Sequence, residues 1–180
     1  MDEVFSRYLD PAFRYVRFQS PARVRSRDDA LRDGLNCVVL AHLVIRGLFG
    51  YALPTRLQAL ELVRDLAHFE PVPARGRRRA GDLVWFGVDR PRVEPGEFVP
   101  QYDGDELANG GDFPVKQVAV CADNRDDGDH LLLHASSADG NTILWPLRKF
   151  AGYDRYRRIY AVRRLRREFR RPTGASGGTL

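Results

Sequence analysis

The sequence predicts an α+β fold in which helices come first and an antiparallel sheet follows. The first half contains an apolar run, Val38 to Phe49, which is too long and too apolar to be anything other than a buried helix. The second half contains short runs rich in β-branched and aromatic residues, separated by turn residues. Closely spaced turns favour antiparallel strands, because parallel strands need longer crossovers.

The chain of 180 residues is long enough for one domain with its own core. We expect residues 1–32 to form an N-terminal extension, with short helices at residues 2–9 and 28–31 and with aromatic side chains that close over the core. The domain itself is expected to span residues 33–168. Residues 169–180 have the composition of a disordered tail.

The central helix is expected to begin at Cys37, because Asp33, Gly34 and Asn36 before it are turn and N-cap types. Gly50 is a plausible stop. In the first turn of a helix, unpaired N–H groups and the helix dipole favour a thiolate, which is how nucleophilic cysteines are often prepared. The alternative is that Cys37 is one more small apolar residue of the core.

The remaining elements follow from turn and cap signals. Thr55 and Gln58 resemble a capping box for an amphipathic surface helix that runs to about Phe69. Residues 87–114 have little periodicity and are either mobile or a flap over a site. Strands are expected at residues 83–86, 115–122, 130–135, 142–145 and 157–164.

The net charge of +5 does not indicate a nucleic-acid-binding body. Six arginines and one glutamate after residue 162 account for all of it, and the body is neutral. The mean hydropathy of −0.41, an acidic start and the lack of a long apolar span predict a cytoplasmic protein without a membrane segment.

Cys37 and Cys121 are expected to be free thiols. No histidine lies close to either in sequence, so we expect no zinc site, and no nucleotide or phosphate fingerprint indicates a cofactor. Cys121 is expected to be a buried side chain on its strand.

The stretch from Asp33 to about Leu165 resembles the NlpC/P60 family of papain-like cysteine enzymes. Four segments match the family's motifs in order: Gly34-Leu35-Asn36-Cys37 at the head of the helix, Leu53-Pro54-Thr55 with Gln58, Ala80-Gly81-Asp82-Leu83-Val84-Trp85-Phe86, and Leu132-Leu133-His134-Ala135-Ser136. The resemblance implies a papain-like fold, with the Cys37 helix packed on the sheet. It also implies activity on peptide-like substrates by amide hydrolysis or acyl transfer.

One departure from the family pattern concerns the general base. The family's catalytic histidine opens a strand that here reads Gln117-Val118-Ala119-Val120-Cys121. A glutamine amide does not titrate, although it can hydrogen-bond an oxyanion. His134 matches the position that in the family orients the base.

Three functions remain open. In the first, Cys37 is the nucleophile, with His134 from the face that the helix packs on as the base, or with an acyl donor that needs none. In the second, the chain is an inactive module that binds a peptide-like ligand. In the third, it is an interaction protein that uses its arginine-rich end. Candidate substrate-binding residues are Asn36, Trp85 and Tyr15.

The other histidines are expected to be peripheral to the chemistry. His42 is five residues after Cys37 and leaves the opposite side of its helix, so it should be a packed core residue. His130 lies close to a turn and is expected to be solvated.

Overall fold

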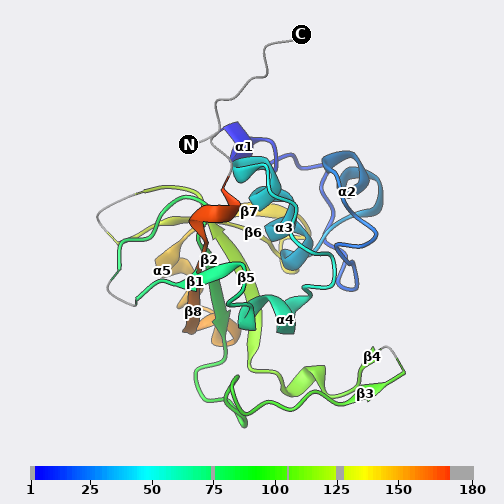
Figure 1. Ribbon diagram of the computed structural model, residues 1–180, viewed down its shortest axis with the longest axis vertical. Helices are drawn as coiled ribbons and strands as arrows, with labels where there is room; N and C mark the ends of the chain where they lie inside the picture. The colour runs from blue at the N-terminus through cyan, green and yellow to red at the C-terminus, as the bar shows by residue number, and fades with distance from the viewer. Residues whose placement is uncertain (1–2, 74–75, 105, 125–127, 171–180) are drawn as a thin grey trace.

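The computed structural model describes residues 3–73, 76–104, 106–124 and 128–170 (Figure 1). A six-stranded antiparallel sheet forms its centre, in the order β1-β8-β2-β5-β6-β7. Its strands are β1 (Phe69–Pro71), β2 (Leu83–Gly87), β5 (Val115–Cys121), β6 (Leu131–Ala135), β7 (Thr142–Pro146) and β8 (Arg158–Leu165). The mixed α and β architecture that the sequence predicts is confirmed.

Short helices surround this sheet. They are α1 (Glu3–Ser6), α2 (Arg27–Asp33), α3 (Cys37–Phe49), α4 (Ala59–Arg64) and α5 (Leu147–Phe150), with 3-10 turns η1 (Gly110–Asp112), η2 (Asp154–Tyr156) and η3 (Arg167–Phe169). The longest, α3, packs on β5 and β6. In Figure 1, α1, α2 and α3 lie together, and α5 lies on the other side of the strands.

The bounds of α3 agree with the prediction from its caps. The Asn36 side chain accepts hydrogen bonds from the N–H groups of Val38 and Val39, at 3.1 and 3.0 Å. Gly50 ends the helix with φ 63°, a left-handed conformation in which glycine carries no steric penalty.

Both faces of the sheet are covered. Side chains of one parity along β5 and β6, such as Val118, Val120 and Leu133, join the core under α3. Those of the other parity, such as Ala119 and Leu132, join a second cluster with Trp145 and Phe150. This is why the strands read as nearly continuous apolar runs rather than as alternating ones.

The N-terminal segment is part of the core under α3. Phe5, Tyr8, Phe13 and Val24 are buried there. The segment therefore supplies several of the large side chains on which α3 packs. Phe18 is an exception among its aromatic residues, because it is 84% exposed.

The second predicted helix differs from expectation. Gln58 is itself the N-cap residue and makes no side-chain cap, so Thr55 and Gln58 form no capping box. The helix α4 ends at Arg64, and Phe69 begins strand β1. Three of its six residues (Leu60, Leu62, Val63) are buried, whereas Ala59 and Arg64 are exposed, so α4 is amphipathic as predicted.

Residues 87–114 contain the two-stranded ribbon of β3 (Tyr102–Asp103) and β4 (Glu106–Leu107), which projects from the foot of the sheet (Figure 1). Arg64 anchors this segment by donating to the carbonyl oxygens of Pro95 and Phe98. Phe98 itself is buried against Phe113. These contacts attach the segment to α4.

The last element of the described chain is the 3-10 turn η3. Phe169 packs on Tyr51 and His68, with ring centroids 4.9 and 5.1 Å away. The predicted disordered tail lies, from residue 171 onward, outside the described residues. Within the described ranges, none of the helices has the length and apolar character needed to cross a bilayer.

Candidate active site

Cys37 lies at the head of α3 and is partly exposed. Burial of its sulfur raises the pKa of the thiol, whereas the nearby backbone N–H groups of Val118, Val38 and Cys37 itself act to lower it. Burial is the larger effect. The N–H groups at the helix terminus favour the thiolate as expected, but the net shift is toward the neutral thiol, because desolvating a negative charge costs more than these N–H groups return.

The sulfur meets the sheet where two strands separate. Strand β5 pairs with β6 at Val120↔Leu133 and Cys121↔Leu132. Nearer the start of β5, a side chain rather than the backbone connects the two strands. Gln117 donates to the carbonyl oxygen of Ala135 at 2.9 Å. The backbone N–H that faces Cys37 belongs to Val118, the next residue along β5.

The hydrogen bonds of Gln117 fix the proton on His134. The amide nitrogen Nε2 must face the Ala135 carbonyl oxygen, because that oxygen can only accept. The same nitrogen lies 3.0 Å from His134 Nδ1, so both amide hydrogens are used and Nδ1 accepts. The imidazole proton is then on Nε2, which is buried and has no hydrogen-bond partner among the residues that the structure describes. Neither ring nitrogen offers a free lone pair.

His134 lies on the face of the sheet opposite α3. Its ring packs on Trp145 and Phe150, with centroids 4.5 and 4.9 Å away, and it is 1% exposed. Burial, with a smaller effect from Lys149, lowers the pKa of His134 to about 4. The expectation that His134 shares the face of the Cys37 helix is wrong, because its parity along β6 is that of Leu132.

Asn36 and Trp85 do not form the expected substrate-binding surface. Besides capping α3, Asn36 donates from Nδ2 to the carbonyl oxygens of Gln19 and Arg17, at 2.7 and 3.3 Å, so its side chain is fully used within the protein. Trp85 is 1% exposed and lies in the core under α3. Both residues are structural.

Tyrosine side chains accompany Cys37 instead. Burial raises the pKa of the half-buried Tyr15, and the nearby Cys37 acts in the same direction. Burial likewise raises the pKa of Tyr156, and the nearby Cys37 acts in the same direction. Tyr156 also forms a hydrogen bond with Ser137, which acts to lower its pKa. Tyr15 thus remains a candidate substrate contact. Tyr156 was not identifiable from sequence, because no motif links η2 to the head of α3.

The remaining histidines divide into one expected and one unexpected case. His42 is a packed core residue, as predicted, and its Nε2 lies 2.9 Å from the carbonyl oxygen of Leu57. His130 is 3% exposed rather than solvated. It lies beside Asp123 and Cys121, so three residues able to bind a metal come together, contrary to the expectation from sequence spacing. The hairpin between β5 and β6 produces this proximity.

In comparisons with known proteins, no family model matches the chain, and no match is found among curated proteins.

Proposed function

We propose that this chain is an NlpC/P60-like cysteine enzyme that transfers an acyl group of a peptide-like substrate through a thioester on Cys37. The observation that carries the proposal is the position of the sulfur. The residue is partly exposed at the head of α3, and the N–H groups of Cys37, Val38 and Val118 converge on its desolvated sulfur. Converging N–H groups also stabilise the oxyanion of an acyl-transfer intermediate.

Transfer from a thioester fits this site better than amide hydrolysis. Amide hydrolysis needs a group that protonates a poor leaving group, and neither Gln117 nor His134 has a proton-accepting or proton-donating site directed at the sulfur. In thioester exchange, the Cys37 sulfur bonds to the acyl carbon, the donor's C–S bond breaks, and the leaving thiolate takes the proton of Cys37. An amine then attacks the acyl carbon, releases the amide, and returns a proton to the Cys37 sulfur.

A second function is favoured by the same two side chains. Gln117 and His134 satisfy one another, so neither can act as a base for the Cys37 thiol, whose pKa is raised by burial. The chain would then bind a peptide-like ligand near Tyr15 without reacting. The arginine-rich end as an interaction surface has no comparable support within the described residues.

Mass spectrometry of the intact chain separates the two functions. We expect incubation with small acyl thioesters to add one acyl group to the wild type and to Cys121→Ser, and none to Cys37→Ser. Release of the acyl group by an added amine, faster than by buffer alone, would establish transfer. No adduct with any donor, together with measurable binding of acyl-peptides by calorimetry, would replace the enzyme by the binding module.

Gln117→His tests the role of the missing base. An imidazole at residue 117 can take up a proton beside the Val118 N–H that faces the sulfur, so we expect the variant to be alkylated by iodoacetamide at pH 7 about tenfold faster than the wild type. Gln117→Asn supplies the control, because its amide does not titrate. Equal alkylation rates in all three proteins would show that residue 117 does not affect the reactivity of Cys37.

A further inference from the structure

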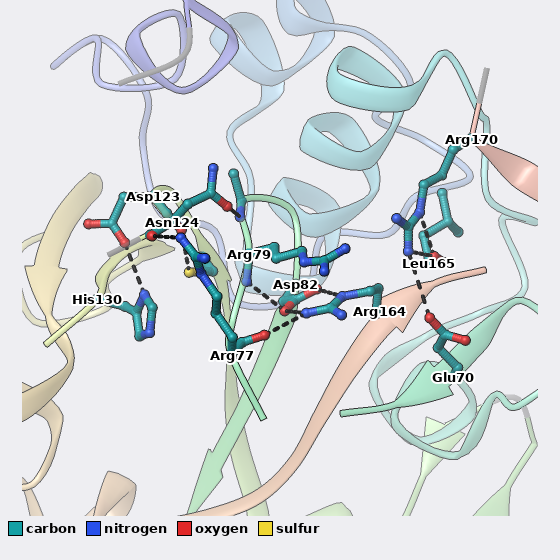
Figure 2. Close-up of polar contacts among 12 residues, drawn as sticks. Glu70, Arg77, Arg79, Asp82, Asp123, Asn124, His130, Arg164, Leu165 and Arg170 are labelled. Atoms are coloured by element: carbon teal, nitrogen blue, oxygen red, sulfur yellow. Dashed lines mark hydrogen bonds and ion pairs between the residues drawn. The ribbon is translucent and has the colours of Figure 1, made fainter. Parts of the chain in front are cut away.

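A second group of reactive side chains lies at the other end of β5. Cys121 ends the strand, Asp123 follows it, and His130 precedes β6, so the hairpin brings together residues from both of its ends (Figure 2). One ligand atom from each of these residues lies within 4.8 Å of the other two. Nothing in the proposed chemistry of Cys37 uses them.

We propose that Cys121, Asp123 and His130 bind a divalent transition-metal ion, with zinc as the best fit. Thiolate, imidazole and carboxylate together are typical zinc ligands, whereas Mg²⁺ and Ca²⁺ prefer sites made of oxygen atoms alone. Three protein ligands leave a fourth position for water.

The three side chains are held in place by the hairpin. The Leu131 N–H donates to Asp123 Oδ2 at 3.1 Å, which leaves Oδ1 directed at His130 Nδ1, also at 3.1 Å. The thiol of Cys121 donates to the carbonyl oxygen of Asp123 at 3.2 Å. Figure 2 shows the imidazole of His130 turned toward the Asp123 carboxylate.

The spacing and the burial suit an ion. In a tetrahedral zinc site, neighbouring ligand atoms lie about 3.3 to 3.8 Å apart. The observed spread therefore requires the widest pair to close by about an ångström. The His130 side chain is 4% exposed and that of Asp123 is 18% exposed, so an ion would enter past the carboxylate into a largely dry site.

Metal binding requires Cys121 to lose its proton. Burial raises the pKa of Cys121 to about 12, and the charge of Asp123 adds to this effect, so an ion has to offset the cost of forming the thiolate. A neutral thiol without exposed surface is no nucleophile, so this Cys, His and Asp do not form a second catalytic site. Zinc would displace the thiol proton to solvent, and a thiolate with a carboxylate would balance its two charges. The guanidinium of Arg78, which acts to lower the pKa of Cys121, opposes the ion.

Metal analysis of the full chain, purified without a polyhistidine tag, tests the site. After incubation with zinc and dialysis, we expect one zinc per chain in the wild type and in Cys37→Ser. In Cys121→Ser and His130→Gln we expect none, and Asp123→Asn should weaken zinc affinity at least about tenfold. Zinc should also raise the melting temperature of the wild type and of Cys37→Ser, but not that of Cys121→Ser.

Cobalt gives a readout on the wild-type fold, which guards against variants that fail to fold. We expect Co²⁺ to produce a thiolate-to-cobalt charge-transfer band and the strong visible bands of a tetrahedral ion in the wild type and in Cys37→Ser. The absence of these bands, or zinc retained equally by wild type and a folded Asp123→Asn or His130→Gln variant, would overturn the proposal. The contacts in the hairpin would then be hydrogen bonds that close the turn and nothing more.

Discussion

The Cys37 sulfur is subject to opposing effects within one helical turn. Converging N–H groups favour the thiolate, and the surrounding protein removes the water that would solvate it. The second effect is the larger, so the resting residue is a thiol. In the proposed exchange with a thioester, Cys37 would still have to ionise before it attacks, and the leaving thiolate would take up the proton afterwards, so the exchange as a whole leaves the proton count unchanged.

The neutral state of His134 predicts a pH dependence of folding. Its pKa is about 4 in the folded chain and about 6.5 when exposed, so the unfolded chain binds the proton first as the pH falls. The contribution of the neutral ring to the free energy of unfolding is fully present above about pH 6.5. It is lost as the pH falls toward 4, and the loss is at most about 3 kcal/mol. Burial also lowers the pKa of His42, which acts in the same direction.

Urea unfolding from pH 4 to 7 measures this loss. His134→Asn keeps an acceptor for Gln117 but does not titrate, so its free energy of unfolding should depend less on pH than that of the wild type. Identical slopes for the two proteins would mean that His134 titrates normally in the folded chain. His42→Asn provides a parallel measurement of the second buried ring.

Among the helices, α3 depends most on a single cap. Asn36→Ala removes two bonds to helix N–H groups and two to the N-terminal segment, and we expect it to cost about 2 kcal/mol. Ser26→Ala removes the cap of the exposed helix α2 and should cost about 1 kcal/mol or less. Equal losses in chemical unfolding would show that the bonds of Asn36 to Arg17 and Gln19 contribute nothing.

Elements with strong local signals were predictable. The helix at 37–49 has a cap residue, an apolar interior and a terminal glycine, and its bounds agree with the structure. The strands β2, β5, β6, β7 and β8 were expected within one or two residues. The missed elements include β1, α5, β3 and β4, which have two to four residues each, too few to show a period. Helix α4 was overextended because its apolar residues continue into the chain that leads to β1.

The site was less predictable than the elements, because it depends on register and on turns. Cys37 could be placed at the head of its helix from local residues alone. The face on which His134 lies depends on the parity of β6 within the sheet, which a motif does not report. Cys121 and His130 are nine positions apart in sequence, and the hairpin brings their side chains close together.

At the scale of the whole molecule, the last strand holds the sheet together. Strand β8 lies between β1 and β2, so β1 joins the sheet, and β2 gains its second neighbour, only when the C-terminal part of the chain is in place. Arg164 on β8 joins Asp82, at the start of β2, through two hydrogen bonds of 2.8 Å (Figure 2). The carboxylate of Asp82 is almost fully buried, and the Arg79 N–H is a further donor to it.

Breaking this pair should therefore destabilise the entire fold. Arg164→Ala leaves a buried carboxylate with one backbone donor, and we expect it to lower the free energy of unfolding by about 3 to 5 kcal/mol in urea titrations. Arg7→Ala breaks an exposed pair with Glu3 and should lower the free energy of unfolding far less than Arg164→Ala does. Adding Asp82→Asn to Arg164→Ala should recover part of the loss, because no unpaired charge remains buried. A double variant as unstable as the sum of its parts would instead assign the loss to packing between β2 and β8.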